Sequence, residues 1–168
     1  DSAVGIPIRT RFRAAGIPEE RVELLSRTPD TLSHLELYRR VDIALDTFPY
    51  HGTTTTCDAL WLGVPVVTRA GDAHVSRVGV SLLQAIGRPE WIANSDEDYI
   101  RIAVMMAADP ARLALIRMTL RERMRASVLL DHAGQAKRFG AALRASWQVW
   151  CERKRSSVTA VQPELAQS

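Results

Sequence analysis

The chain has 168 residues, of which 46% are hydrophobic and 24% are charged, a balance typical of a globular protein. Its length fits one domain, and a chain of this size buries roughly 68–70% of its unfolded surface. The formal net charge is +3 and aromatic residues make up 6%. Because the basic residues are not interleaved with base-stacking aromatics, we interpret them as solvated helix faces and expect no nucleic-acid binding.

No apolar run approaches the ~18 residues of a membrane span, and no signal peptide is visible. We therefore expect no membrane partner and a cytoplasmic protein. Cys57 and Cys151 are far apart and form neither a disulfide framework nor a metal-ligand pattern. The sequence accordingly predicts a reducing compartment and contains no metal-ligand spacing.

The first forty residues predict a helix that ends at Gly16, a short strand over residues 21–26, and a helix over residues 31–38. His34 lies near the start of the second helix. A single histidine there is more often a surface or capping residue than a ligand.

The next stretch has the pattern of a βαβ unit, in which a strand, a tight loop, a helix and a second strand follow one another. The expected elements are a strand over residues 42–48, a turn over 49–52, a helix over 57–62 that Gly63 ends, and a strand over 64–69.

The loop of this unit has the composition of an anion site. Gly52 has no Cβ and lets a ligand approach the backbone. Four threonines, residues 53–56, can donate hydroxyl hydrogen bonds at a helix start, where the amides lack partners and the dipole is positive. Asp58 lies one turn further on, and a ribose hydroxyl suits this carboxylate better than a phosphate. A threonine cluster at this place is equally typical of simple capping and turn chemistry.

A second loop and helix follow at once. His74 and Arg77 lie at the start of a helix predicted over residues 75–86, where they either face a ligand or serve as surface and structural residues. A last short strand is expected over residues 91–93. The remaining third of the chain is predicted to be helical, with Ser95 and Asp109 as N-caps.

The final helix is expected over residues 132–153, with Phe139, Trp147 and Trp150 as packing residues. Residues 1–155 would then form the lobe. Residues 156–168 form a polar segment that we expect to be disordered.

Two runs carry a family resemblance, LDTFPYHGTTTTCDALWLGVPVVT over residues 45–68 and AGDAHVSRVGVSLLQAIGRPEWIA over residues 70–93. They resemble the C-terminal lobe of the SPINDLY-like and O-linked N-acetylglucosamine transferases, including bacterial members, and the similarity extends from about residue 9 to residue 150. The resemblance implies an α/β fold: the Rossmann-like C-terminal lobe of a two-lobed GT-B glycosyltransferase, with a parallel sheet of roughly four strands and a helical C-terminal third.

The resemblance also implies a function, the binding of UDP-GlcNAc in an inverting transfer to serine or threonine hydroxyls of acceptor proteins. The resemblance implies no metal and no cofactor, with UDP-GlcNAc as the donor substrate, and no catalytic residue or general base can be assigned. Thr54, Thr55 and Asp58 match the family's nucleotide contacts. His34 matches a histidine that lines the family's nucleotide pocket, and Gly52 matches its loop glycine.

The chain departs from the family pattern in the loop. His51 stands where bacterial members usually have asparagine, and Thr53 stands in place of a second glycine or of the histidine of animal relatives. We keep Thr53 as a candidate ligand, and His51, His74 and Arg77 as weaker ones. The family's N-terminal lobe, its tetratricopeptide repeats and a diphosphate-contacting lysine do not occur in the sequence.

These absences predict a fragment that is inactive without the N-terminal lobe. Two alternatives remain open at this point. One is a GT-B enzyme that uses a different nucleotide sugar, and the other is a truncated, non-catalytic nucleotide-binding or interaction module.

Overall fold

The computed structural model describes residues 5–161 of the chain. It divides into two compact units, one ending at Leu37 and the other beginning at Tyr38, where the length of the chain predicted one domain. No helix among the described residues is both long enough and apolar enough to cross a membrane.

The first unit is helical. It contains α1 (Gly5–Ala14), the 3-10 turn η1 (Glu19–Arg21) and α2 (Thr31–Glu36). The helix stop predicted at Gly16 is confirmed, since this glycine has φ +77°, which favours residues without a Cβ. The N-cap of α2 is Asp30, whose side chain accepts from Ser33 N–H.

The strand predicted over residues 21–26 is wrong. Arg21 ends η1, and the residues after it have irregular backbone. The carbonyl of Val22 accepts a hydrogen bond from Arg9 Nη1 at 3.0 Å. A side chain thus takes up a group that a sheet partner would otherwise bind.

The second unit contains a parallel three-stranded sheet in the order β1 (Ala44–Leu45), β2 (Val66–Arg69) and β3 (Ile92–Ala93). We predicted roughly four strands and a longer first strand. β1 is short because its pairing with β2 ends at Asp46, whose N–H donates to Val67 O. Pro49 soon follows, and proline cannot donate to a sheet.

The helices of the second unit lie mostly where the sequence predicts helical segments, although one 3-10 turn includes Trp91, where the last strand was expected to begin. They are η2 (Leu37–Arg40, which spans the boundary), α3 (Thr54–Trp61), η3 (His74–Ser76), α4 (Val78–Ala85), η4 (Pro89–Trp91), α5 (Asp96–Ala107), α6 (Pro110–Arg125) and α7 (His132–Val161). The predicted N-caps Ser95 and Asp109 are confirmed, since each side chain accepts from the backbone N–H three residues later.

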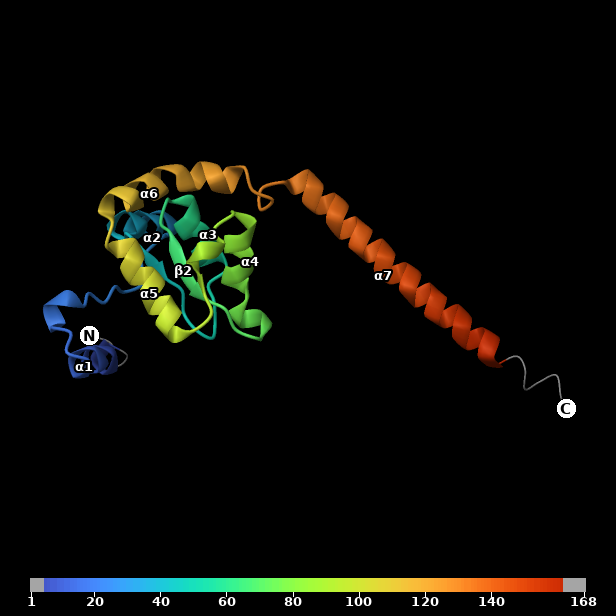
Figure 1. Cartoon of the computed structure of the whole chain (residues 1–168), viewed down its shortest axis with the longest axis horizontal. Coiled ribbons are helices and arrows are strands. Elements are labelled where there is room, and N and C mark those ends of the chain that lie inside the picture. Colours follow the sequence, from blue (N-terminus) through green and yellow to red (C-terminus); the bar gives the residue numbers. More distant parts are fainter. Residues whose placement is uncertain (1–4, 162–168) are drawn as a thin grey trace. The chain divides into compact units, whose positions relative to one another are not determined.

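The central strand β2 is covered on both faces (Figure 1). Val66 packs in the larger core cluster with Leu60 of α3 and Leu83 of α4, while Val67 packs in the smaller cluster with Ile102 of α5. Successive strand residues point to opposite faces, so the two valines pack against helices on opposite sides of the sheet. This arrangement, helices on both faces of a parallel sheet, is that of an α/β lobe.

The last helix is longer than predicted. α7 continues to Val161, six residues into the segment expected to be disordered, because neither proline nor glycine occurs between Gly140 and Pro163. Residues 162–168 lie outside the described residues. Trp147 and Trp150 stack with ring centroids 5.0 Å apart, and both are at least half exposed.

Tyr99 of α5 ties the helix to the end of β1. Its hydroxyl donates to Asp46 O at 2.8 Å, and burial, together with the charge of Asp46, raises the pKa of Tyr99 to about 12. A tyrosine whose folded-state pKa exceeds its unfolded value of ~10 stabilises the fold below pH 10 and loses this contribution as the pH rises to about 12.

We therefore expect Tyr99→Phe to lower stability by about 1 kcal/mol at neutral pH and to flatten part of the decline between pH 10 and 12. Urea unfolding of both proteins at several pH values measures this. Parallel alkaline declines in the two proteins would contradict the assignment.

Candidate functional site

The threonine loop lies at the carboxyl end of β1 and leads directly into α3. The helix begins at Thr54, three residues earlier than predicted, so Thr54 and Thr55 belong to its first turn. Thr53 occupies the N-cap position, but its side chain makes no capping hydrogen bond. This N-terminus of α3 is therefore open on the side where a ligand would approach.

Three exposed threonines at the start of α3 have hydroxyl groups that are available as hydrogen-bond donors. Within the part of the chain that the structure describes, the hydroxyls of Thr53, Thr54 and Thr55 make no hydrogen bond. The first hydrogen bond of α3 is donated by Cys57 N–H to Thr53 O at 3.0 Å, so the amides before it have no helical acceptor. Hydroxyls and amides together present a cluster of donors at the positive end of the helix.

Thr56 differs from its three neighbours. It is 4% exposed, and its hydroxyl donates to Gly52 O at 3.0 Å. The fourth threonine is thus a structural residue that ties the first turn of α3 back to the loop. A Cβ on Gly52 would lie 2.9 Å from the Thr56 hydroxyl oxygen, so the position favours glycine.

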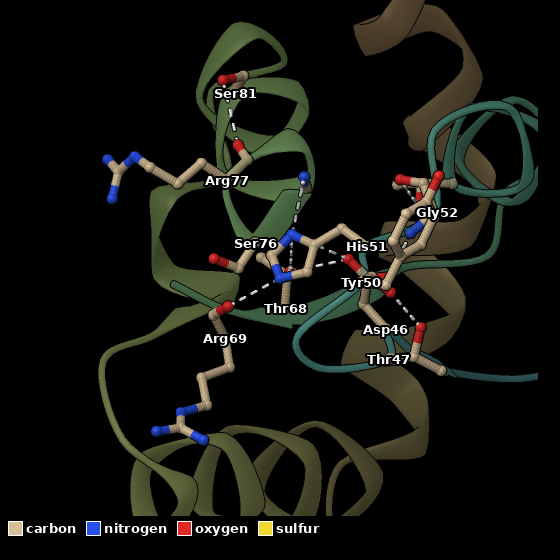
Figure 2. A network of polar contacts seen from close by, with 12 residues as sticks. Asp46, Thr47, Tyr50, His51, Gly52, Thr68, Arg69, Ser76, Arg77 and Ser81 are labelled. Atoms are coloured by element: carbon tan, nitrogen blue, oxygen red, sulfur yellow. Dashed lines mark hydrogen bonds and ion pairs between the residues drawn. The ribbon is translucent and has the colours of Figure 1, made fainter. Parts of the chain in front are cut away.

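A buried polar network lies beneath the loop (Figure 2). The carboxylate of Asp46 accepts from Gly52 N–H at 2.9 Å through Oδ1 and from the Thr68 hydroxyl at 2.8 Å through Oδ2. The Gly52 amide is therefore occupied, and this residue contributes close backbone approach to the site rather than a donor.

His51 belongs to this network and is 2% exposed. Its Nε2–H donates to Arg69 O at 2.9 Å, and its Nδ1 accepts from Gly79 N–H at 3.1 Å. Since one ring nitrogen donates and the other accepts, the imidazole is neutral. The geometry gives His51 a structural role between the loop and α4 and leaves no ring nitrogen for a ligand.

The second predicted helix start does lie beside the loop. His51 N–H donates to Val75 O at 2.9 Å, which joins the loop to η3, and His74 and Arg77 are both exposed there. Arg77 Nη1 donates to Gly71 O at 3.0 Å, and Figure 2 shows its guanidinium pointing away from Gly52. The structure thus brings the segment to the loop, but it does not direct Arg77 toward the threonines.

Asp58 is half-buried and lies one turn beyond Thr54, on the same side of α3. Burial raises the pKa of Tyr38, and the charge of Asp58 raises it further. The Tyr38 hydroxyl also donates to Thr55 O at 3.3 Å. A tyrosine and a carboxylate therefore border the donor cluster at the first turn of α3.

His34 is exposed on α2, which belongs to the first unit, whereas the other candidates belong to the second. Among the described residues, no three His, Cys, Asp or Glu side chains come together in a way that could hold a metal ion.

Sequence reasoning missed several residues that shape the site. Tyr38 lacked any motif, and Asp46 and Thr68 lay inside predicted strands, where polar residues are read as exposed. The signal was available in part, because Asp46 and Thr68 interrupt apolar runs at the carboxyl ends of neighbouring parallel strands, where side chains meet. The missed site residues are Tyr38, Asp46, Thr68 and Gly79.

Helices on both faces of a parallel sheet, with one of them beginning at the carboxyl edge of that sheet, define the class of Rossmann-like lobes. Comparison with known proteins specifies the class further. Residues 3–139 match the description "Glycosyl transferase family 41". The chain belongs to this glycosyltransferase family.

Similar proteins share this assignment. A probable UDP-N-acetylglucosamine–peptide N-acetylglucosaminyltransferase SPINDLY of Petunia hybrida is 38% identical over 149 residues, which cover 86% of this chain and 16% of that protein. A protein of the same description from Oryza sativa is 41% identical over 149 residues, with the same coverage. The chain therefore spans about a sixth of the length of these relatives.

A solved structure supports the fold. A mutant of the Thermobaculum terrenum O-GlcNAc transferase aligns with a TM-score of 0.83 and 36% identity, over 92% of this chain and 29% of that one. The predicted Rossmann-like lobe of a GT-B glycosyltransferase is confirmed by this likeness.

Proposed function

We propose that this chain is the donor-binding lobe of a protein O-GlcNAc transferase-like enzyme and that the N-terminus of α3 binds the diphosphate of UDP-GlcNAc. The observation that carries the proposal is the pair of exposed hydroxyls of Thr54 and Thr55, which have no hydrogen-bond partner within residues 5–161 and lie beside open amides in the first turn of α3. Hydrogen bonds to charged groups contribute about 1.5–3 kcal/mol each, so a few of them hold a diphosphate firmly.

The reaction proposed for the whole enzyme is an inverting transfer of GlcNAc to serine or threonine hydroxyls of acceptor proteins. The amides and hydroxyls at the start of α3 donate hydrogen bonds to the diphosphate, and the helix dipole favours its negative charge. In this proposal the charge is stabilised without a metal ion. Transfer requires donor and acceptor to be held together at attack distance. We accordingly propose that this chain needs an N-terminal lobe, preceded by tetratricopeptide repeats, for activity.

The names of the similar proteins support the choice of donor, because those from Petunia hybrida and Oryza sativa both specify UDP-N-acetylglucosamine. The cytoplasmic setting is part of the same proposal. It is supported by Cys57 and Cys151, which are both free thiols in the structure.

Calorimetric titration of the chain with UDP, UDP-GlcNAc, UDP-glucose and uridine tests the proposal. Binding of UDP and UDP-GlcNAc is expected, with weaker binding of uridine because it lacks the diphosphate. Absence of UDP binding by the folded chain would refute the proposed site. Preference for UDP-glucose would favour a GT-B enzyme with another donor sugar.

Asp58 provides a second test, because we assign its carboxylate to the ribose hydroxyls. Asp58→Asn retains one acceptor but loses the charge, so it is expected to weaken uridine and UDP by similar factors. Should the variant lose thermal stability yet bind uridine like the wild type, Asp58 only complements the dipole of α3, an effect of about 0.3–1 kcal/mol.

A further inference from the structure

We propose that Asp46 is a positioning residue, which holds the α3 loop in the conformation that receives a ligand. It does not contact the ligand itself, because its side chain is only 4% exposed. The inference rests on the proposed function, since it concerns the same loop, but it assigns a task to a residue outside the donor cluster.

Asp46 is itself fixed from two sides. Its N–H donates to Val67 O at 2.9 Å, which anchors it to β2, and its carbonyl accepts from the Tyr99 hydroxyl at 2.8 Å. The Thr68 hydroxyl then orients the carboxylate through Oδ2. With backbone and side chain both held, Oδ1 has a defined position from which to bind the loop.

Two successive hydrogen bonds connect Asp46 Oδ1 to the first turn of α3, which carries the donor cluster. Asp46 Oδ1 accepts from Gly52 N–H at 2.9 Å, and Gly52 O accepts from the Thr56 hydroxyl at 3.0 Å. Thr56 lies in the first turn of α3, next to Thr55. Asp46 therefore determines where that first turn presents its open hydroxyls.

Packing leaves little room for another acceptor. A Cβ built on Gly79 would lie 2.6 Å from both Asp46 Oδ2 and the Thr68 hydroxyl oxygen, and 3.0 Å from His51 Nδ1. A methyl group does not fit between α4 and this network. Loss of the carboxylate therefore leaves the Gly52 amide without its acceptor in a closely packed environment.

The test compares Asp46→Ala and Asp46→Asn with Asp42→Ala, a control near the other end of the same segment whose side chain is 81% exposed. In the ligand-free protein we expect Asp46→Ala to speed amide hydrogen exchange over residues 50–58 about tenfold and to weaken UDP about tenfold. Asp46→Asn is expected to restore both to within about threefold, because its amide oxygen can accept from Gly52 N–H. Asp42→Ala is expected to change neither.

The outcomes separate the two proposals. Exchange that rises over the whole of α4 and α5 as well would show a general structural role and overturn the assignment, as would wild-type UDP affinity in Asp46→Ala. If the wild-type protein does not bind UDP, the proposed function is refuted. Faster amide exchange in Asp46→Ala that is confined to the loop would still identify Asp46 as the residue that anchors it.

A measurement on the wild type alone covers the case in which Asp46→Ala does not fold. The Gly52 amide, with its acceptor, is expected to exchange about tenfold more slowly than the Thr54 amide, which has none. Equal exchange at the two amides would overturn the proposal.

Discussion

Replacing both Thr54 and Thr55 by alanine is expected to weaken UDP binding by about 2–4 kcal/mol, which is about 30-fold to several hundred-fold in affinity. The two hydroxyls are exposed, lie in the first turn of α3 and have no hydrogen-bond partner among the described residues. Their removal is therefore expected to change the stability of the fold little and to weaken UDP binding strongly. Calorimetry gives the affinity, and circular dichroism checks that the helices remain.

A matched control is Thr119→Ala on α6. Its hydroxyl donates to the Leu115 and Ile116 carbonyls of its own helix, so it makes contacts with no part of the loop. It should leave the affinity for UDP unchanged. If the double variant of Thr54 and Thr55 binds UDP like this control, the loop is not the diphosphate site.

Leu60→Ala is expected to destabilise the second unit by about 2–5 kcal/mol, the range for truncating a buried leucine. Leu60 is 0% exposed and belongs to the core cluster that joins α3 to β2 and α4. The alanine would leave a cavity beneath the helix whose N-terminus carries the site. Urea unfolding followed by tryptophan fluorescence measures the loss, with an unchanged m value as the sign of unaltered compactness.

Leu115→Ala serves as the comparison, since Leu115 is 60% exposed on α6 and its truncation should change stability by no more than about 0.5 kcal/mol. A loss below 1 kcal/mol in Leu60→Ala would mean that α3 is packed less tightly than the structure indicates. The position of the donor cluster would then be less well defined.

Local patterns predicted the second unit well. The alternation of apolar runs with glycine stops gave the βαβ order, and the N-caps Ser95 and Asp109 were identified by residue type. The strand over residues 21–26 failed because an apolar run does not reveal whether a partner strand is available. The predicted strands were too long because pairing with a neighbouring strand, rather than the propensity of the residues, decides where a strand ends.

The site could be predicted as a loop but not as a network. Thr54 and Thr55 were identified from their place before a predicted helix and Asp58 from its place in the first turn of that helix, and in the structure all three lie in α3. The burial of His51 could not be foreseen, because its acceptor function depends on Gly79 N–H, 28 residues further along the chain. Such a contact requires the packing of α4 against β2, which periodicity does not specify.

The strand order has a consequence for how the molecule is made. Because β1, β2 and β3 are neighbours in the sheet in the same order as in the chain, each strand pairs with the next one to be synthesised. Ala44 pairs with Val66 and Thr68 pairs with Ile92, so no pairing needs to wait for a distant segment. Parallel strands cannot be joined by a tight hairpin, so each pairing has to wait only for the crossover that lies between the two strands. All three described strands precede α5, so the sheet that carries Asp46 is specified by the chain up to Ala93.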